Sequence, residues 1–448
     1  MTGGVIVAAA LDAEHRRQRA AAATTVTQID VVDGSSASAL RRWTSGAFAA
    51  AAACVADAMK IPPSLLRLFA LTSSAAPGGE RDRPPPPCMP GVLHAIGNTP
   101  MIRVKSLSDA TGCDILIKCE FANPGGSVKD RVALRIIQEA LASGDLRPGG
   151  IVTEGTAGST GVSLAMVAGA LGCRAYLALP DDAALEKSQM MAAYGAEVER
   201  VRPVSITNRG HFVNVARRKA ETETATNGPG AGFFANQFEN LANFRAHVEG
   251  TAPEIWAQCG GRVDTFVCAA GTGGTLAGIA TYLKERDPTV GCYLVDPPGS
   301  SLYNKVTRGV MYTREEAEGK RLRNPFDTIT EGVGINRLTA NFSIAVGDGG
   351  AGLKEGPSLL SGAYKASDRE AVEMSRYLAR EDGLFLGSSS CVNLVGAVKV
   401  ARALGPGRRG VTIACDSGVR HLTKFWSPEY VAKHGLAPEA TGLEFLGQ

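Results

Sequence analysis

The sequence predicts an α/β fold built on mostly parallel sheets that are covered by helices on both faces. From residue 91 onward, short apolar runs alternate with segments of helical periodicity, and glycine-rich loops join them. Hydrophobic residues make up 44% of the 448 residues and charged residues 20%, which suits a large buried core. Strands and helices that alternate in this way are typical of doubly wound sheets, whose strands are buried on both faces.

The expected elements follow in order along the chain. Buried strands are expected at the short apolar runs, which are residues 115–119, 151–153, 176–179, 233–235, 265–269, 293–295, 384–386 and 411–415. Helices are expected where apolar residues recur every three to four positions, at residues 132–142, 160–171, 185–194, 243–257, 275–285, 368–380 and 393–403. Ligands of such folds bind at the carboxyl ends of the strands, so the functional residues should lie in strand-to-helix loops.

Residues 1–90 differ in composition from the rest of the chain. They are rich in alanine and serine, carry several arginines and end in a proline-rich hinge at 83–90. Such a leader is typical of an organellar transit peptide, but acidic residues interrupt it, and a disordered extension is an equal alternative. We therefore expect a mitochondrial or cytoplasmic protein. The apolar stretch 46–56 is short for a bilayer span, so any membrane association is expected only through this leader.

Charge and cysteine content narrow the functional class. The 47 basic and 44 acidic residues give a net charge of +3, which argues against a nucleic-acid partner because binding one needs a concentrated basic face. The ten cysteines show no metal-type spacing, so no metal site is expected. Cysteines inside apolar runs are typical of buried reduced thiols, and a reducing compartment fits them best.

The stretch from Asn123 to Arg131 is the most informative loop. Its sequence N-P-G-G-S-V-K-D-R places Lys129 beside two glycines, between an expected strand and an expected helix. A lysine that is partly desolvated at such a turn has a lowered pKa and can form a Schiff base. A solvated surface lysine is the more common explanation for a lone residue of this type, so the case depends on the other loops.

A second loop, residues 271–275, has the sequence G-T-G-G-T and follows an apolar run. Its three glycines let backbone N–H groups converge at the start of a helix, which is typical of a phosphate site. The spacing lacks the G-x-G-x-x-G dinucleotide pattern, so a single phosphate fits better. A tight strand-to-helix turn without a ligand is the alternative.

Two more loops join strands to helices and offer hydroxyl groups. The loop at residues 155–161 has the sequence G-T-A-G-S-T-G and would suit a carboxylate. A helix start capped by Ser159 or Thr160 is the alternative, and it does not exclude that function. The other loop, residues 387–390, has the sequence G-S-S-S.

Pyridoxal phosphate acting on an amino acid would account for all three features at the strand ends, which are an imine-forming lysine, a phosphate site and a carboxylate site. The chain resembles the cysteine synthase and cystathionine β-synthase group, the fold-type-II or β-family of pyridoxal-phosphate enzymes, and is most similar to a fungal cysteine-synthase-like branch. The resemblance is carried by the lysine and 271–275 loops and by motifs at residues 96–100, 236–240, 250–256, 331–334 and 416–418.

The resemblance implies two doubly wound sheets with the cofactor in the cleft between two lobes, and a homodimer. The larger lobe would hold residues 91–131 and 237–448, and the smaller, mobile lobe residues 132–236. Lys129 would form the Schiff base and then remove the substrate Cα proton. The implied cofactor contacts are Ser159, Gly271, Thr272, Gly273, Gly274, Thr275 and Ser389, with Ser390 as the alternative at the pyridine nitrogen. The implied substrate contacts are Thr156, Gly158, Thr160, Gln237 and Gly332.

One departure bears on the substrate. The family loop reads T-S-G-N-T-G, whereas this chain has Ala157 and Ser159 where the family has serine and asparagine. The asparagine normally bonds the 3′-oxygen of the cofactor, and losing one such bond could cost about 1–3 kcal/mol.

The implied reaction is β-replacement of O-acetylserine by sulfide, which gives cysteine and acetate. Cystathionine β-synthase activity is one alternative, disfavoured by the short stretch after the 416–418 motif. Serine or threonine β-elimination is another, and a scaffold or sensor that binds the cofactor without turnover is a non-enzymatic one.

Overall fold

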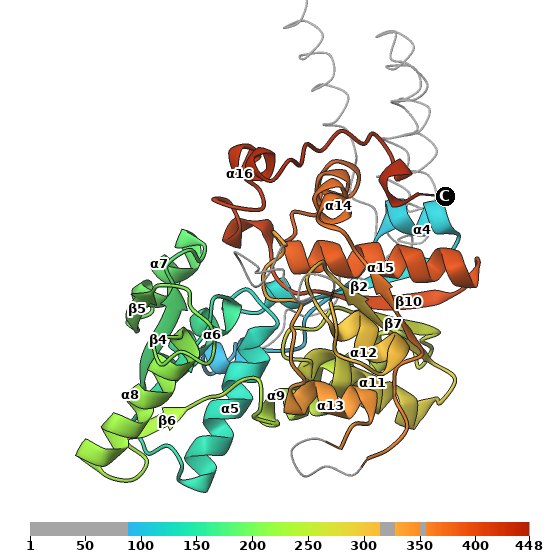
Figure 1. Ribbon diagram of the computed structural model, residues 1–448. Helices are drawn as coiled ribbons and strands as arrows, with labels where there is room; N and C mark the ends of the chain where they lie inside the picture. Colours follow the sequence, from blue (N-terminus) through green and yellow to red (C-terminus); the bar gives the residue numbers. More distant parts are fainter. Residues whose placement is uncertain (1–87, 314–327, 350–354, 448) are drawn as a thin grey trace, which may run out of the picture. The chain divides into compact units, whose positions relative to one another are not determined.

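Two β-sheets form the framework of the structure, a computed structural model that describes residues 88–313, 328–349 and 355–447 (Figure 1). The larger sheet has the strand order β1-β2-β10-β7-β8-β9, and the smaller sheet the order β5-β4-β3-β6. The β1–β2 pair is antiparallel and the other named pairs are parallel. The expected α/β fold with two mostly parallel sheets is therefore confirmed.

The larger sheet is covered on both faces. Its strands are β1 (Met101–Arg103), β2 (Asp114–Cys119), β7 (Thr265–Cys268), β8 (Gly291–Asp296), β9 (Gly362–Lys365) and β10 (Arg409–Ala414). One core packs it against α4 (Lys105–Thr111), α14 (Asp368–Glu381) and α15 (Ser388–Leu404). The other core packs it against α10 (Ala252–Gln258), α11 (Gly274–Arg286), α12 (Leu302–Arg308) and α13 (Ala340–Val346).

The smaller sheet stands beside the larger one and is drawn mainly in green in Figure 1. Its strands are β3 (Ile151–Gly155), β4 (Arg174–Pro180), β5 (Glu197–Val201) and β6 (Gly232–Phe234). Helices α5 (Lys129–Ser143) and α6 (Ser159–Ala170) pack on one face, α7 (Leu185–Ala193) lies against α6, and α8 (Phe212–Asn227) covers the other face. All four strands fall within residues 132–236, the range expected for the smaller lobe, while most of the predicted leader lies outside the described residues.

One expected strand, at residues 384–386, is wrong. Leu386 makes a single bridge to Ser417, and the neighbouring backbone bonds run from Gly387 to Asp416 and from Gly418 to Phe385. Phe385 stacks on Trp426 with ring centroids 4.2 Å apart. The segment is apolar because it packs against this C-terminal region, and not because it belongs to a sheet.

The expected helix at residues 243–257 is interrupted. It divides into α9 (Ala242–Ala246), a π-helical turn (His247–Thr251) and α10. Such turns redirect side chains and recur at functional sites. The C-terminal segment contains one further short helix, α16 (Pro428–Lys433). Among the residues that the structure describes, no helix is long and apolar enough to cross a membrane.

Candidate active site

Lys129 is the first residue of α5 and lies beside the carboxyl ends of β7 and β10. The turn before it is held by Val128, whose N–H donates to the Cys415 carbonyl at 2.9 Å. The Gly125 N–H donates to the carboxylate of Asp130 at 2.6 Å. The loop is therefore fixed on both sides of the lysine.

The Lys129 ammonium lies in a weakly polar environment. Its side chain is half-buried, and Nζ has no hydrogen-bond or ion-pair partner in the described part of the chain. Desolvation lowers the pKa of Lys129, and the thiols of Cys268 and Cys415 only partly oppose this shift. A lysine in this state has a larger neutral fraction, which is the form that attacks a carbonyl or accepts a proton.

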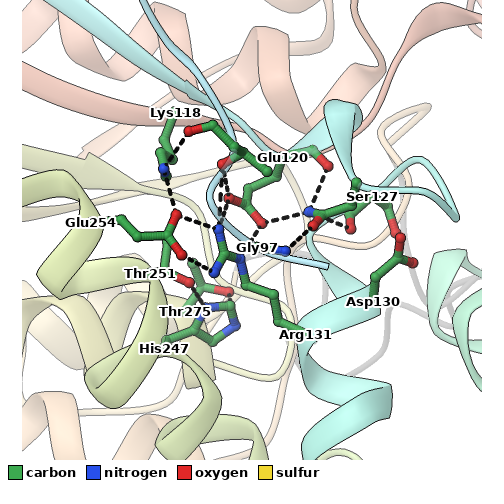
Figure 2. Close-up of polar contacts among 12 residues, drawn as sticks. Gly97, Lys118, Glu120, Ser127, Asp130, Arg131, His247, Thr251, Glu254 and Thr275 are labelled. Atoms are coloured by element: carbon green, nitrogen blue, oxygen red, sulfur yellow. Dashed lines mark hydrogen bonds and ion pairs between the residues drawn. The ribbon is translucent and has the colours of Figure 1, made fainter. Parts of the chain in front are cut away.

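A buried cluster of charges lies next to the lysine loop (Figure 2). The Arg131 guanidinium pairs with Glu120 at 2.8 Å and with Glu254 at 2.7 Å, and Lys118 pairs with Glu254 at 2.6 Å. Burial alone would raise the pKa of Glu254, but hydrogen bonds and charge from Arg131 lower it to about 2. Arg131 follows Lys129 by two positions, so this cluster fixes the start of α5.

The 271–275 loop joins β7 to the N-terminus of α11. A Cβ atom on Gly271 would lie 2.3 Å from the Gly332 carbonyl oxygen, and one on Gly273 would lie 2.5 Å from Cβ of Phe342. Gly273 also has a φ of 88°, a left-handed conformation that favours glycine. The N–H groups of residues 271–273 have no acceptor among the described residues. The loop thus presents free donors at the positive end of a helix, as a phosphate site requires.

The hydroxyl groups of the 271–275 loop are held by the scaffold. Thr272 Oγ1 accepts from Asn243 Nδ2 at 2.8 Å. Thr275 Oγ1 lies 3.1 Å from His247 Nε2, and His247 Nδ1 lies 2.9 Å from Thr251 Oγ1 (Figure 2). Desolvation, helped by the charges of Lys129 and Arg131, lowers the pKa of His247 well below its usual range. A neutral imidazole therefore holds Thr275 in place.

The 155–161 loop lies between β3 and α6. Gly158 is the N-cap of α6 and no side chain caps this helix, so the alternative of a cap by Ser159 or Thr160 is wrong. Thr160 Oγ1 instead donates to Gln237 Oε1 at 2.6 Å. Thr156 Oγ1 accepts from the Gly158 N–H at 3.1 Å, which leaves its own hydroxyl proton free.

A chain of hydrogen bonds joins the 155–161 loop to the 271–275 loop. Gln237, which accepts from Thr160, has a backbone carbonyl that accepts from Asn243 Nδ2 at 3.0 Å. The same Asn243 side chain bonds Thr272. The structure therefore links three of the residues with implied contacts, Thr160, Gln237 and Thr272, through Asn243.

Ser159 is engaged by a residue that sequence reasoning missed. Its hydroxyl donates to Asp416 Oδ2 at 3.2 Å, and the same oxygen lies 3.1 Å from His421 Nε2. Burial alone would raise the pKa of Asp416, but the His421 ring lowers it to about 2. Ser159 therefore gives its single proton to a carboxylate. The D-S-G motif at 416–418 drew attention to this segment, but nothing in the sequence linked it to Ser159.

Ser389 and Ser390 both lie in the first turn of α15. Ser390 Oγ donates to the Asp416 carbonyl at 3.1 Å and accepts from the Asp416 N–H at 3.4 Å. The Ser389 hydroxyl faces the thiol of Cys415, whose pKa burial raises to about 12. Ser390 is therefore engaged by the backbone, whereas Ser389 lies beside Cys415, a thiol that is also close enough to Lys129 to influence it.

Two other buried groups near the site had no sequence prediction. Glu154 ends the apolar run of β3 and is fully buried, and His247 lies in the π-helical turn. A glutamate inside the run I-V-T-E-G was a visible signal, because an isolated buried carboxyl is costly. Among the described residues, no group of side chains could hold a metal ion.

The residues fit pyridoxal phosphate on three independent grounds. Within the described structure the 271–273 N–H groups lack acceptors and the lysine amine is unpaired, and the thiols of Cys268 and Cys415 lie near that amine. A phosphate, an aldehyde and a weakly polar ring would satisfy these features in turn.

Comparisons with known proteins agree with this assignment. A family model described as pyridoxal-phosphate dependent enzyme matches residues 92–416. The chain is 52% identical to cysteine synthase 2 of Schizosaccharomyces pombe over 360 residues, which cover 80% of this chain and 88% of that protein. It is 46% identical over 364 residues to a Saccharomyces cerevisiae protein whose name includes the words mitochondrial cysteine synthase, covering 80% and 89% of the two chains.

Among solved structures, the fold matches an O-ureido-L-serine-bound mutant of O-ureido-L-serine synthase with a TM-score of 0.63. The two chains are 28% identical, and the match covers 76% of this chain and 94% of that one. Three observations point to the same cofactor, namely a lysine with a lowered pKa, a glycine-lined phosphate site and a family match over most of the chain. The chain belongs to the fold-type-II family of pyridoxal-phosphate-dependent enzymes.

Proposed function

We propose that the protein is a cysteine synthase, which replaces the acetate of O-acetylserine by sulfide. The observation that carries this proposal is the hydrogen-bond chain Thr160–Gln237–Asn243–Thr272, beside the unpaired amine of Lys129. It holds an anion-binding loop for an amino-acid carboxylate at a set position from the phosphate loop. When bound, pyridoxal phosphate withdraws electrons from the substrate Cα. The names and identities of the relatives support the same reaction.

Each protein group has a defined task in this reaction. Thr156, Thr160 and Gln237 orient the substrate carboxylate, and the free N–H groups of residues 271–273 bind the cofactor phosphate. Lys129 accepts the Cα proton on its neutral Nζ, the Cβ–O bond breaks and acetate leaves. Hydrosulfide then forms the Cβ–S bond, and Lys129 returns the proton to Cα. Ser389 would offer a hydroxyl to the pyridine nitrogen, and a hydroxyl would not force protonation of that nitrogen as a carboxylate would.

Two ionised carboxyls lie near the 155–161 loop, Asp416 bonded to Ser159 and Glu331 beside His421. Asp416 and Glu331 both have a pKa of about 2, the latter because Lys187, His421 and Lys424 outweigh the effect of its burial. Neither carboxyl can give a proton near neutral pH. Acetate leaves as an anion without a proton, whereas the hydroxyl of serine needs one. Lys129, once it has taken the Cα proton, is itself an acid that can protonate a serine hydroxyl, so the two carboxyls do not decide between the substrates. The preference for O-acetylserine rests on the cysteine synthase names of the relatives.

The test follows the visible absorbance of the purified holoenzyme. O-acetylserine added alone should change the cofactor band, and sulfide should restore it with stoichiometric release of cysteine and acetate. Serine and threonine are the comparison substrates. A response to serine that exceeds the response to O-acetylserine would overturn the substrate assignment, and a band that responds to no amino acid would favour a scaffold or sensor.

Lys129→Ala is the decisive variant. It should lose the cofactor band and reduce turnover by about 10³-fold or more, because it removes both the imine-forming amine and the base. Lys433→Ala is the matched control, since Lys433 is exposed on α16 and should leave both readouts unchanged. Full turnover by Lys129→Ala would contradict the mechanism.

Oligomeric state and location are finer proposals that rest on the family resemblance and on the leader at residues 1–90. A homodimer is proposed, and light scattering of the purified holoenzyme tests it. Import into mitochondria is proposed through the leader, since one relative's name includes the word mitochondrial. A fluorescent fusion of the full chain compared with one that begins at residue 88 would show whether the leader directs it there.

A further inference from the structure

Glu154 lies directly behind the residue that is proposed to bind the substrate carboxylate. Its side chain is 0% exposed, and Oε2 accepts from the backbone N–H of Gln237 at 3.2 Å. The side-chain amide of Gln237 and the N–H groups of Asn236 and Gly155 also face this carboxyl. The other oxygen, Oε1, has no hydrogen-bond partner in the described structure. Glu154 is thus bound to Gln237 but is not fully satisfied by the protein.

The backbone at this point is held in an uncommon conformation. Asn236 has a φ of 51°, one of two non-glycine residues with positive φ in the described part of the chain. This left-handed residue turns the chain after β6, so that the Gln237 N–H points at Glu154. Asparagine tolerates the conformation better than most residues, and such strain recurs at functional sites.

Among the described residues, no cation is paired with Glu154. It shares a sheet face with Val152, and this face packs against α5 and α6, while α8 covers the opposite face behind Gly155. Helix α6 contains no ionisable residue. The ionisable groups on α5 are Lys129, Asp130, Arg131, Arg135 and Glu139. The Lys129 amine lies near the thiols of Cys268 and Cys415, and the other four bond to residues other than Glu154. His211, which caps α8, accepts from the Val213 N–H.

The partners of these groups can be named. Asp130 accepts from Ser163, Arg131 pairs with Glu120 and Glu254, and Arg135 pairs with Glu139. Arg245 on α9 also pairs with Glu139, and Glu239, in the loop after β6, pairs with Arg337. These five charged groups therefore have partners other than Glu154, and Glu154 is a lone buried carboxyl within the part of the chain that the structure describes.

We propose that Glu154 is a positioning residue that aims the Gln237 amide at the substrate carboxylate and that it does so as the neutral acid. This inference rests on the proposed function, because it assigns a partner to the carboxylate-binding residue. A negative charge behind Gln237 would repel the incoming carboxylate, whereas a neutral carboxyl group still accepts the Gln237 N–H. Burial raises the pKa of Glu154 to about 8, although hydrogen bonds from Gln237 and Asn236 act in the opposite direction. With this pKa the carboxyl group is mostly neutral near pH 7.

The proposal predicts a pH dependence of substrate binding. If only neutral Glu154 permits binding, affinity falls as the pH rises through 8, and the loss relative to a non-ionising variant reaches about tenfold at pH 9. Glu154→Gln is the matched variant, because its amide cannot ionise and still offers an oxygen to the Gln237 N–H. The probe is L-alanine, an amino acid without a leaving group on Cβ, whose binding is read from the cofactor band.

At pH 7 we expect the dissociation constants of the wild type and of Glu154→Gln for L-alanine to differ by no more than about threefold. At pH 9 the dissociation constant of the wild type should be about tenfold higher than that of Glu154→Gln. The titration of the alanine amine and of Lys129 is common to both proteins and cancels in the ratio. Parallel pH profiles would overturn the proposal while leaving O-acetylserine turnover, and so the proposed function, intact. A wild-type band that responds to neither amino acid would overturn both.

A second comparison separates positioning from a general structural role. Gln237→Ala should weaken L-alanine binding at least tenfold and leave cofactor binding unchanged. In that background Glu154→Gln should have a smaller effect on the ratio between pH 7 and pH 9, because the side-chain amide that Glu154 positions is absent and only repulsion across space remains. An undiminished effect of Glu154→Gln in the double variant would contradict the proposal.

Discussion

The two loops that meet at the site are built in different ways. In the 271–275 loop, added Cβ atoms on Gly271 and Gly273 would lie 2.3 and 2.5 Å from neighbouring atoms. The ends of the 155–161 loop are equally tight, since a Cβ on Gly155 would lie 2.4 Å from Cα of Val213. Its centre is open, because the nearest atom to a Cβ on Gly158 is Thr156 Oγ1 at 4.0 Å.

The hydroxyl groups of both loops bond to buried side chains, which come from different parts of the chain. The hydroxyls of Thr272 and Thr275 bond to Asn243 and His247, which are buried in the helical scaffold. The hydroxyl of Ser159 bonds to the Asp416 side chain, which comes from a distant part of the chain. A tightly packed loop is suited to a phosphate that stays bound, whereas an open centre is suited to a substrate that enters and leaves.

Gly273→Ala is the strongest test of this difference. It places a non-glycine residue at φ 88° and a methyl group against Phe342, at a combined cost of about 3–5 kcal/mol. The apparent dissociation constant of pyridoxal phosphate should rise by about 100-fold or more. Equilibrium titration of the apoenzyme with the cofactor measures this.

Gly158→Ala is the matched control for that measurement. Its φ of −130° is open to any residue, and nothing lies closer than 4.0 Å to the new methyl group. Cofactor affinity should stay as in the wild type, while the KM for O-acetylserine rises because the methyl group enters the carboxylate site. Equal losses of cofactor affinity in the two variants would contradict the comparison.

Glu254→Gln tests whether the buried charge cluster beside the lysine loop stabilises the folded protein. The pKa of Glu254 lies at about 2 against an ordinary 4.5, so its stabilising effect is present above pH 4.5 and is lost as the pH falls toward 2. This effect corresponds to about 3 kcal/mol. Urea unfolding at pH 7 should show a loss of this order, and the pH dependence between 4.5 and 2 should become flatter.

The control for the charge cluster is an exposed pair. Arg380 and Glu381 form an ion pair with side-chain exposures of 48% and 41%, so Glu381→Gln should change the free energy of unfolding by about 0–1 kcal/mol. A similar loss in both variants would show that the buried position of Glu254 is not the reason for its effect.

Ser159→Ala should have the smallest effect. It removes a single hydrogen bond to Asp416, which is worth about 1–3 kcal/mol at most when a charged acceptor is left with fewer donors. We expect the KM for O-acetylserine to rise by up to about tenfold, with cofactor affinity unchanged. Ser159→Asn, which restores the family residue, tests whether this position sets the substrate preference. A loss of cofactor affinity as large as that of Gly273→Ala would contradict the distinction between the two loops.

The sequence predicted strongly periodic elements well. The strand expected at 115–119 is Asp114–Cys119, and the helix expected at 275–285 is Gly274–Arg286. It missed β5, whose sequence E-V-E-R-V carries charges because it is an edge strand exposed to solvent. It also missed β1 and β9, which are too short for a periodic signal.

The amino-acid sequence by itself determined the chemistry that the site can carry. A lysine after N-P-G-G-S-V, a G-T-G-G-T loop and a G-T-A-G-S-T-G loop are local patterns, because a glycine turn at a helix start needs only adjacent residues. These patterns led to the cofactor and the family, both of which the structure and the comparisons support.

Only the tertiary structure decided how these groups are held and tuned. Ser159 and Asp416 are 257 positions apart, and Gln237 and Glu154 are 83 apart, so no local pattern could pair them. Burial produces the lowered pKa of Lys129 and the raised pKa of Glu154, and burial depends on the packing of both sheets and their helices. Sequence identifies the reactive groups, but desolvation and long-range partners, which exist only in the folded chain, set their protonation states.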